Sequence, residues 1–575
     1  MRLGGVVVFL RCLGVHAGRD GDGLLGAAGG GVFGRGEALR AAAAAAPRAI
    51  TVFPEADARI RVTDLLGQAE SCAAALVADG VAGGDIVGVL APTGPGLLVA
   101  LFGAWLAGAA VTVLPLPTLS DADGQRRRLY RIADSTRMRH LVADASCLEY
   151  AAPLQKALPR LRVRPAICPQ APAAALPSTA PDDLAVVQFT SGTTTHPRGV
   201  MLSHRAVIAG LRAIAISSGL TRQDVLVQWM PFCHDMGLFG YMAQLLSGGD
   251  VHLFDPLVLL RRPAELLRYM SACRATLMTG MNSAYQILID AAAPAILQQL
   301  DLSRWRLAYN GAEPVSAATV QRFAETFRPA GVAAHVMFPV YGLAEATLPV
   351  LFPELGTPPG MVTFDRQELG NTGQVRLVGP SHSQAKTVVS VGRPVTGMEV
   401  RLASEHGPAP GDGQLGEIQV RGEAVTSGYL NDAAATAALF HGDWLRTGDL
   451  GFRIGADYYV VGRRKEMIIV HGRNYFPEDA ETVARSVPGV YRQRAVAVAD
   501  SRAASGERIA VIAETSLTGA DRDRLERQIL QLSADELGMA HIIVHLVTPR
   551  WLTRTTSGKW QRLLAARKLS EASKP

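Results

Sequence analysis

The 575-residue chain carries 57 Lys and Arg against 51 Asp and Glu, a net charge of only +6 at pH 7. These basic residues form no long run, which argues against a nucleic-acid-binding protein. Six cysteines occur singly, without a C-x-x-C pair or histidines at zinc spacing, so we expect a reduced compartment and no structural metal. A hydrophobic share of 48% with 19% charged residues is typical of a globular enzyme, and the length predicts several folding units.

The first 34 residues are rich in glycine, and we expect either a disordered leader or a wrongly chosen start. The apolar run at 5–10 follows Arg2 but ends at Arg11, and no convincing small-residue cleavage site follows. A secretory signal peptide is therefore the weaker interpretation of this region.

An uncharged stretch at 86–120 is long enough to cross a bilayer. Prolines interrupt it near both ends, and Gly103 and Gly108 make the part between them less hydrophobic. We therefore expect no transmembrane insertion, but a buried helix at about 97–109 followed by a buried strand at about 110–115.

Short runs of Val, Ile and Leu alternate with helical patterns from about residue 35, which predicts parallel sheets flanked by helices. The expected strands of a first α/β layer lie within 85–92, 109–116 and 139–145. A Pro/Ala-rich linker at 165–182 follows. The expected strands of a second α/β layer lie within 225–231, 249–256, 274–280 and 306–311.

The pattern changes at 391–461, where runs such as 416–422 and 457–463 have a period of two residues. This alternation predicts antiparallel strands in a small barrel-like subdomain. A compact α+β tail of the size of one small domain follows Arg464.

The most informative segment is QFTSGTTTHPRGVMLS at 188–203, which follows a β-prone run. Small residues let backbone N–H groups approach a phosphate, and the hydroxyl groups add donors. Arg198 adds a cation that can reach back over the loop, and an amphipathic helix is expected from near Ser203. The string is not a Walker A motif, and loop chemistry alone leaves an ordinary turn open. The candidate phosphate ligands are Thr190, Ser191, Gly192, Thr193, Thr194, Arg198 and Gly199.

Five further motifs follow in order: YNGAEPV (309–315), YGLAEATL (341–348), WLRTGDLGF (444–452), GRRKEMIIVHGRNYFPED (462–479) and TTSGKWQR (555–562). Their order and spacing resemble the adenylate-forming superfamily of acyl-CoA synthetases, luciferases and peptide-synthetase adenylation domains, from about residue 35 to 570. The variants MPFCHDMGL (230–238), NGAEPV, YGLAEAT and IIVHGRN are similar to those of its fatty acyl-AMP ligase branch.

The resemblance implies an α/β fold with a large N-terminal domain at 35–463, made of two α/β subdomains and a small β-barrel-like subdomain. A small, mobile α+β C-terminal domain at 464–575 would follow. The implied cofactors are ATP and Mg²⁺. The implied reaction has two halves: a carboxylate attacks the α-phosphate to give acyl-adenylate and pyrophosphate, and a thiol then takes the acyl group.

The same resemblance assigns the nucleotide site. Asp449 of RTGD would accept hydrogen bonds from both ribose hydroxyls, which suits an acceptor-only carboxylate. Glu345 matches the Mg²⁺ carboxylate, although an isolated Glu is more often a surface residue. The implied adenine site consists of Tyr341, Gly342, Gly311, Ala312 and Glu313.

Three basic residues match the family's arginine and two lysines that act in catalysis and domain rotation. Arg463 matches the ribose and phosphate arginine, and Lys465 falls at the hinge of the small domain. Lys559 matches the lysine that swings to the α-phosphate and the substrate carboxylate. Ser557 and Gly558 place Lys559 on a flexible loop.

The HDMG signature, formed by His234, Asp235, Met236 and Gly237, lies beside the acyl tunnel in the family. His234 would gate that tunnel or meet the carboxylate, whereas a lone histidine is more often structural. The other residues expected to line the apolar acyl pocket are Met281, Asn282 and Tyr285.

The chain is longer at about 355–388 than is expected of acyl-CoA synthetases, and this extra segment resembles the insertion that sets fatty acyl-AMP ligases apart from them. The resemblance implies that it packs between the domains and hinders rotation; a tolerated surface loop is the alternative. Ile469, Val470 and His471 stand where many CoA ligases carry a lysine near the hinge. Both departures favour the phosphopantetheine arm of a carrier over free CoA.

The sequence therefore predicts a cytoplasmic ligase, or one peripheral at a membrane, in fatty acid metabolism and lipid or polyketide biosynthesis. It would activate a medium- or long-chain fatty acid and pass it to an acyl carrier protein or a polyketide synthase carrier domain. Two alternatives stay open: an acyl-CoA synthetase that uses free CoA, and a non-catalytic nucleotide- or acyl-binding relative.

Overall fold

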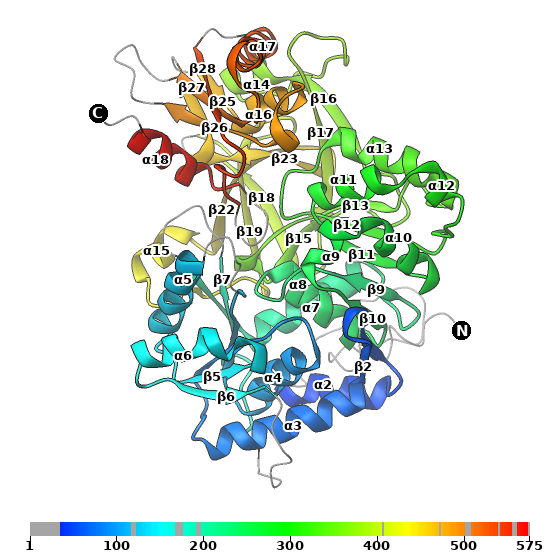
Figure 1. The fold of residues 1–575 in the computed structure, drawn as a ribbon, viewed down its shortest axis with the longest axis vertical. Helices are drawn as coiled ribbons and strands as arrows, with labels where there is room; N and C mark the ends of the chain where they lie inside the picture. The colour runs from blue at the N-terminus through cyan, green and yellow to red at the C-terminus, as the bar shows by residue number, and fades with distance from the viewer. Residues whose placement is uncertain are drawn as a thin grey trace.

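The computed structural model describes most of the chain, namely residues 35–116, 122–166, 176–190, 197–404, 407–470, 473–500, 508–538, 541–554 and 560–572. The predicted features outside these ranges are the leader 1–34, the phosphate ligands Ser191, Gly192, Thr193 and Thr194, His471, and the Ser557, Gly558 and Lys559 segment. Figure 1 shows a large body of sheets and helices with a smaller unit, formed by the chain after Arg464, above it.

The first α/β layer is a seven-stranded sheet with the order β20-β8-β7-β4-β3-β5-β6. Its strands are β3 (Ile86–Leu90), β4 (Ala110–Val113), β5 (His140–Ala143), β6 (Arg162–Pro165), β7 (Leu184–Phe189), β8 (Gly199–Ser203) and β20 (Gly428–Tyr429). The pairings among β3 to β7 are parallel, which confirms the three strands predicted for this layer. Its helices are α2 (Arg35–Ala45), α3 (Val62–Ala78), α4 (Pro95–Leu106), α5 (Ala122–Ser135) and α6 (Leu148–Ala157).

Strand β8 is a feature that the sequence analysis missed. It runs antiparallel to β7 and pairs on its other side with β20, so the phosphate loop joins two strands. Val200 and Leu202 are fully buried because alternate side chains of β8 face the core. Only then does helix α7 (His204–Ser217) begin, with the Ser203 hydroxyl accepting a hydrogen bond from the Ala206 N–H.

The described part of the uncharged stretch, residues 86–116, contributes to the core, as predicted. Every residue of α4 from Gly96 to Leu106 is buried, and β4 follows it within the sheet. In the described part of the chain, no helix is both long enough and apolar enough to cross a membrane.

The second α/β layer is a seven-stranded sheet with the order β13-β12-β11-β9-β10-β1-β2. Its strands are β1 (Ile50–Phe53), β2 (Ala58–Arg61), β9 (Val225–Gln228), β10 (Asp250–Leu253), β11 (Leu277–Gly280), β12 (Leu307–Asn310) and β13 (Met337–Pro339). All pairings are parallel except that of the edge strand β2, and the four predicted strands are confirmed. The helices of this layer, besides α7, are α8 (Asp235–Leu246), α9 (Pro256–Arg261), α10 (Pro263–Ala272), α11 (Asn282–Ala291), α12 (Pro294–Leu297) and α13 (Ala317–Phe327).

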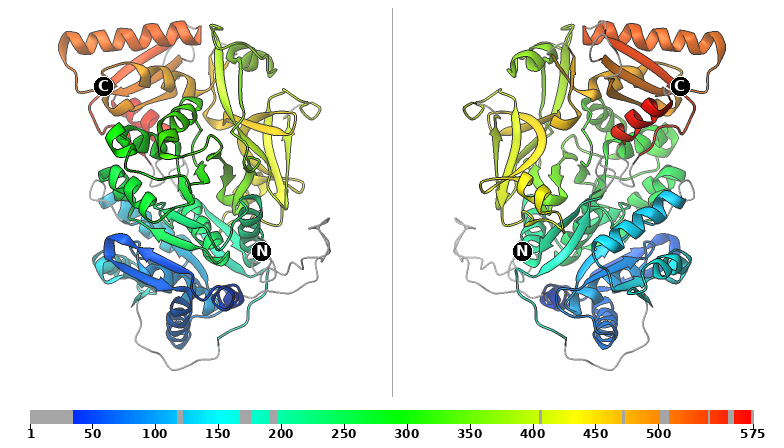
Figure 2. Two further views of the ribbon diagram at one scale, coloured as in Figure 1. Left: turned by 90° about the vertical axis from the view of Figure 1, so that its right-hand side faces the viewer. Right: turned by 90° about the vertical axis from the view of Figure 1, so that its left-hand side faces the viewer.

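A third, nine-stranded sheet confirms the predicted antiparallel subdomain and extends it upstream of residue 391. Its strands are β14 (Tyr341–Leu343), β15 (Leu348–Phe352), β16 (Met361–Asp365), β17 (Ala385–Pro394), β18 (Met398–Ala403), β19 (Gly416–Gly422), β21 (Phe440–His441), β22 (Trp444–Ile454) and β23 (Asp457–Arg463). The helices α14 (Arg366–Thr372) and α15 (Ala433–Leu439) join them. In Figure 2 this sheet rises along one side of the molecule.

The C-terminal unit is α+β, as predicted, and has a hydrophobic core of its own. Ile468, Ala480, Ile509, Ile529 and Val544 are among the buried residues of that core. Its elements are β24 (Ile468–Val470), β25 (Arg473–Tyr475), α16 (Pro477–Ser486), β26 (Ala495–Asp500), β27 (Arg508–Glu514), α17 (Gly519–Leu537), β28 (Ile542–Val547) and α18 (Arg562–Ala572).

An ion pair with a buried carboxylate fixes the end of the second sheet that lies opposite the candidate site. Arg306 donates from Nε to Oδ1 of Asp224 at 2.7 Å and from Nη2 to Oδ2 at 2.8 Å. The carboxylate also accepts bonds from the Thr276 hydroxyl and the Thr221 N–H. Burial alone would raise the pKa of Asp224, but Arg306 and these donors hold it below its ordinary value.

We expect Arg306→Met to lower the free energy of unfolding by about 3–5 kcal/mol, because Asp224 would stay buried without its cation. The pKa of Asp224 is lower in the folded than in the unfolded protein, so the ion pair stabilises the fold fully above the unfolded-state pKa. This stabilisation is lost as the pH falls through the folded-state pKa. The difference in unfolding free energy between wild type and Arg306→Met should therefore shrink below about pH 4. Urea unfolding at several pH values measures it. Arg322→Met, which breaks the exposed pair with Asp290, is the control and should cost about 1 kcal/mol or less.

Candidate active site

The candidate site lies at one edge of the second sheet because its central strands run parallel. Carboxyl ends of parallel strands meet at a common edge, and the chain segments that leave them lie side by side. Strand β9 leads to His234, β11 to Met281, β12 to Gly311 and β13 to Tyr341. Four motifs that are far apart in the sequence are thus brought together, as the predicted adenylation site requires.

The loop after β12 has the tight geometry expected of an adenine-binding turn. Ala312 has a φ of 65°, in the left-handed region that non-glycine residues rarely adopt. A β-carbon at Gly311 would lie 2.9 Å from the Val340 carbonyl oxygen, so only glycine fits there. The Glu313 carboxylate accepts a 2.6 Å bond from the Ser283 N–H and so ties this loop to the one after β11.

Asp449 is held between two predicted site residues. The Tyr341 hydroxyl donates to its Oδ2 at 2.7 Å, and Arg463 Nε lies 2.9 Å from its Oδ1. Asp449 and Arg463 are paired positions on β22 and β23, so the third sheet positions both. Burial, and then the Asp449 charge, raise the pKa of Tyr341 well above its ordinary value, which keeps its hydroxyl a donor. Gly342 follows Tyr341 in β14, at the same edge.

Glu345 lies in a single 3₁₀ turn, Ala344–Ala346, that follows β14. Its Oε1 accepts a 2.7 Å hydrogen bond from the Tyr429 hydroxyl, and its backbone carbonyl accepts one from the Thr426 N–H. The Arg198 guanidinium lies over the Tyr429 ring at 5.2 Å. Burial, and then the Glu345 charge, raise the pKa of Tyr429 above its ordinary value. Tyr429 therefore links the predicted magnesium carboxylate to the phosphate-loop arginine.

The phosphate loop is closed at its base by a backbone hydrogen bond from the Thr190 N–H to the Arg198 carbonyl, at 3.0 Å. Arg198 Nε also lies 3.7 Å from Asp432 Oδ2. Gly199 starts β8 directly after Arg198. The structure thus places Thr190, Arg198 and Gly199 at the ends of the loop, and the four residues between them that the sequence predicts as phosphate ligands lie outside the described residues.

The HDMG motif forms the entry to helix α8, for which buried His234 is the N-cap residue. Gly237 is required there because a β-carbon would lie 2.2 Å from the Pro231 carbonyl oxygen. Asp235 accepts a bond from the Met236 N–H at 2.8 Å, and buried Met236 belongs to the main core. The motif is therefore a close packing of a loop against the first turn of a helix.

Two buried glutamines that the sequence analysis did not select hold this motif in place. Gln188 of β7 donates to the Cys233 carbonyl at 2.6 Å, and Gln228 of β9 donates to the Gly237 carbonyl at 2.9 Å. The loop between β9 and α8 is therefore fixed to both α/β layers. Burial in the same place raises the pKa of Cys233 to about 11, which keeps its thiol protonated and argues against a nucleophile.

The three other residues predicted to line the acyl pocket lie at the start of α11. Met281 is the N-cap and is buried, and the Asn282 side chain accepts a 3.0 Å bond from the Ser316 N–H. Tyr285 is fully buried, donates to the carbonyls of Tyr309 and Met278, and packs against aromatic rings of the core. The Tyr285 hydroxyl thus links the backbones of β11 and β12.

The predicted hinge, Lys465, is exposed in a 3₁₀ turn, Arg464–Glu466, between β23 and β24. Glu466 and two carboxylates of α16 surround Arg562, which lies 2.8 Å from Glu478 and 2.6 Å from the buried Glu481. Burial lowers the pKa of Arg554, and the charge of Glu313, in the loop after β12, opposes this fall.

The predicted insertion is built into the structure as β16, α14 and the first part of β17. Lys386 of β17 forms a 2.7 Å ion pair with Asp479 of α16, and both side chains are largely buried. Asn474 donates to the Gly370 carbonyl at 3.1 Å, and Phe476 shares a core with Phe364 and its neighbours. The insertion therefore binds the C-terminal unit to the third sheet.

Comparisons with known proteins agree with this site. The chain matches the AMP-binding enzyme family over residues 39–430. It is 34% identical over 397 residues to the medium-chain-fatty-acid–[acyl-carrier-protein] ligase JamA of Moorena producens, which covers 66% of this chain and 67% of JamA. It is 30% identical over 508 residues to the long-chain-fatty-acid–AMP ligase FadD26 of Mycobacterium marinum, over 83% of this chain and 86% of FadD26.

A solved chain from structural and functional studies of the fatty acyl-adenylate ligases of E. coli and L. pneumophila is 29% identical, with a TM-score of 0.88. The match covers 94% of this chain and 98% of that one. By contrast, the chain spans only 67% of the length of JamA and 64% of a similar carrier-protein ligase.

We expect Asp449→Ala to lower kcat/KM for fatty-acid-dependent ATP–pyrophosphate exchange by about 10- to 150-fold, the effect of losing a hydrogen-bonded charge worth 1.5–3 kcal/mol. Asp457→Ala is the control, because Asp457 lies at the far end of the same β22–β23 hairpin and pairs with Arg393. Equal activity of the Asp449→Ala and Asp457→Ala proteins would contradict the placement of the nucleotide.

Proposed function

Because the chain belongs to the AMP-binding enzymes and, among them, to the fatty acyl-AMP ligases, we propose that it activates a medium- or long-chain fatty acid with ATP. The product is an acyl-adenylate, and the acyl group then passes to the phosphopantetheine thiol of an acyl carrier protein or a polyketide synthase carrier domain. The named relatives that act on medium-chain acids and carrier proteins support this choice of substrate and acceptor.

The observation that carries the proposal is the position of Asp449. Its two oxygens face Tyr341 and Arg463 at the edge where the adenine loop also lies. A buried carboxylate with a polar partner on each oxygen, beside a left-handed turn, suits a ribose with its base. The ribose hydroxyls need acceptors, and the base needs a backbone that it can approach closely.

The first half-reaction brings a carboxylate against the α-phosphate, so positioning and charge neutralisation dominate catalysis. The carboxylate oxygen bonds to phosphorus as the bond to the pyrophosphate oxygen breaks. We assign Arg198 and the ligands Thr190, Ser191, Gly192, Thr193, Thr194 and Gly199 to the β- and γ-phosphates, and Lys559 to the α-phosphate and the attacking carboxylate. Arg463 and Asp449 hold the ribose side, while Tyr341, Gly342, Gly311, Ala312 and Glu313 hold the base.

Glu345 fits a magnesium ion that arrives with ATP. In the described residues no group of three or more His, Cys, Asp and Glu could hold a metal by itself. Mg²⁺ commonly uses one or two protein carboxylates together with substrate phosphates, which matches a single carboxylate that Tyr429 links to Arg198. When bound, the ion neutralises phosphate charge, and Tyr429 keeps the Glu345 carboxylate oriented.

The acyl chain is assigned to the space beside the HDMG motif, with His234 at its entrance and Asp235, Met236, Gly237, Met281, Asn282 and Tyr285 around it. The burial of His234, Met236, Met281 and Tyr285 supports this assignment. In the second half-reaction the thiol sulfur bonds to the carbonyl carbon, the bond from that carbon to the AMP oxygen breaks, and the thiol proton passes to solvent.

The contacts of the insertion support a carrier rather than free CoA as the acceptor. We assign 35–463 to the adenylation domain and 464–575 to the C-terminal domain that rotates about Lys465. Lys386 and Asp479 would have to separate before that rotation. Free thiols among the described cysteines are in keeping with a cytoplasmic protein, which we also propose.

A fatty-acid panel, scored by mass spectrometry for acyl-adenylate and then for acyl-carrier or acyl-CoA, tests this function. We expect medium- or long-chain adenylates with carrier loading well above CoA loading, and loss of adenylate in Lys559→Ala. Equal or better loading of CoA would favour an acyl-CoA synthetase. Unchanged turnover of Lys559→Ala, or no adenylate from any acid, would favour a non-catalytic relative.

Tyr429→Phe should raise the Mg²⁺ concentration needed for half-maximal pyrophosphate exchange by about tenfold, because one hydrogen bond to a charged group contributes roughly 1.5 kcal/mol. The measurement is a Mg²⁺ titration at saturating ATP. Tyr458→Phe, which removes only a bond to the Val400 carbonyl, should leave the titration unchanged. An identical curve for wild type and Tyr429→Phe would contradict the role of Glu345.

Lys386→Met should increase acyl transfer to free CoA by several-fold relative to wild type while adenylate formation stays constant, because it removes one tie between the insertion and α16. Acyl-CoA and acyl-adenylate are measured in the same samples. Arg421→Met, which breaks the exposed pair with Glu399, is the control. If Lys386→Met shows no increase in acyl transfer to CoA, the Lys386–Asp479 ion pair does not restrain the C-terminal unit.

A further inference from the structure

Trp560 is the first described residue after Lys559, and three arginines contact its ring. The Arg554 guanidinium lies 3.9 Å from the centroid of the ring. Those of Arg494 and Arg485 lie 5.4 Å and 5.6 Å from it. All three distances are below about 6 Å, the limit for a cation–π interaction. The indole ring is therefore held by cations that come from three separate places in the C-terminal unit.

Two of these cations are fixed by carboxylates that are themselves buried. Arg494 Nε lies 2.7 Å from Oε2 of Glu514, and Arg485 Nη2 lies 2.9 Å from Oε2 of Glu481. Both carboxylates are at most 1% exposed. Because an ion pair with a buried carboxylate is costly to break, these two guanidinium groups have little freedom to leave the Trp560 ring.

The backbone of Trp560 closes the base of the segment that carries Lys559. Trp560 and Arg554 are paired in an antiparallel bridge. Beside it, the Gln561 N–H donates to the Thr553 carbonyl at 3.1 Å. Lys559 directly precedes Trp560 in the sequence, and consecutive Cα atoms lie about 3.8 Å apart. A displacement of Trp560 is therefore passed on to the backbone of Lys559.

This cluster gathers like charges, at a cost that packing alone does not explain. Burial lowers the pKa of Arg554, and the charges of Arg485 and Arg494 lower it further. Apolar neighbours would pack against the Trp560 ring without this repulsion. Departures of this kind from the most stable arrangement are expected where function requires a fixed position.

We propose that Trp560 is a positioning residue for Lys559: the three arginines hold its ring, and the ring holds the backbone from which Lys559 reaches the α-phosphate. This inference rests on the proposed role of Lys559 and adds how the C-terminal unit keeps that residue in place. Arg562, two residues beyond Trp560, is bound by Glu466 of the turn that contains Lys465. Trp560 and Lys559 are therefore joined to the turn about which the unit is proposed to rotate.

The test compares two reactions of each variant: fatty-acid-dependent ATP–pyrophosphate exchange, and transfer from synthetic acyl-adenylate to a phosphopantetheinylated carrier. In Trp560→Leu we expect the kcat of exchange to fall by about 10- to 100-fold, because a misplacement of about 1 Å can have this effect. The KM for ATP and for the fatty acid should stay within about twofold, since Lys559 acts in the transition state. Transfer from the synthetic adenylate should be unchanged, because Lys559 is not assigned to that step.

Trp560→Tyr is the conservative variant, since a tyrosine still offers an aromatic face to Arg554, and it should retain the kcat within about threefold. Trp551→Leu is the matched control. Trp551 packs against the same core as Trp560 and lies under the Lys568 ammonium at 5.2 Å, but it takes no part in the bridge. Its loss should lower stability like that of Trp560 and leave the kcat of exchange unchanged.

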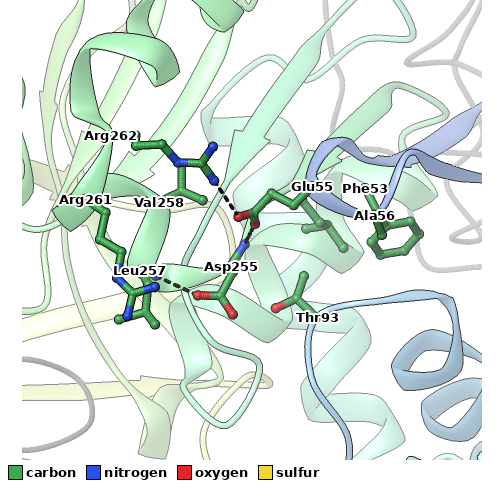
Figure 3. Close-up of a pocket in the computed structure, with 10 residues that line it drawn as sticks. Phe53, Glu55, Ala56, Thr93, Asp255, Leu257, Val258, Arg261 and Arg262 are labelled. Carbon is green, nitrogen blue, oxygen red and sulfur yellow. Dashed lines mark hydrogen bonds and ion pairs between the residues drawn. The ribbon is translucent and has the colours of Figure 1, made fainter. Parts of the chain in front are cut away.

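Arg554→Met removes only the nearest cation and should lower the kcat of exchange by about two- to fivefold, the size of one cation–π contact. Its control is Arg262→Met. Arg262 follows α9 and pairs with Glu55 at 3.6 Å in the wall of a cavity of about 360 Å³, as Figure 3 shows. Breaking that pair should leave exchange unchanged.

An equal fall of the kcat in Trp551→Leu and Trp560→Leu overturns the positioning role. So does an unchanged kcat in Trp560→Leu when Lys559→Ala is inactive, or a loss of transfer from the synthetic adenylate in Trp560→Leu. Should Trp560→Leu not fold, an unchanged kcat in Arg554→Met overturns it. Full exchange activity of Lys559→Ala overturns the proposed role of Lys559 itself, and that of Trp560 with it.

Discussion

The direction of the strands in the second sheet is the constraint on which the rest of the structure depends. From β13 to β1 they run parallel, so every segment that leaves a carboxyl end reaches the same edge. Four of these segments carry the HDMG motif, Met281, the turn at Ala312, and Tyr341. Antiparallel strands would send half of them to the opposite edge, where the Asp224 and Arg306 pair lies, and no common site could form.

The edge alone does not complete the site, because its charged groups come from other sheets. Asp449 and Arg463 stand opposite each other in the third sheet, and Tyr341 joins that pair to the second sheet. Tyr429 makes the corresponding link from Glu345 to the first sheet and the phosphate loop. Nucleotide binding is thus coupled to the packing of all three sheets, and the insertion extends this coupling to the C-terminal unit through Lys386.

The sequence predicted the parts of this site that depend on local chain chemistry. Runs of Val, Ile and Leu located three of the seven strands in the first sheet and four of the seven in the second. Asp449 and Glu345 were found because short motifs surround them. The chain between Arg198 and Ser203 was not expected to be a strand, because β8 is specified by its partners β7 and β20 rather than by its own five residues. The contacts of Tyr429 and of the buried glutamines at 188 and 228 were missed for the same reason: they join segments that only the tertiary fold brings together. Tyr285, placed by its spacing in the acyl pocket, has its hydroxyl bonded to two core carbonyls.

The most direct test of the account follows oxygen from the fatty acid. An acid labelled with ¹⁸O in both carboxylate positions is incubated with ATP, Mg²⁺ and a phosphopantetheinylated carrier, and AMP is analysed by mass spectrometry. Attack of the carboxylate on the α-phosphate, followed by cleavage of the carbon–oxygen bond by the thiol, predicts one ¹⁸O atom in each AMP released. Unlabelled AMP, or ADP in its place, would contradict an acyl-adenylate formed at this edge of the sheet.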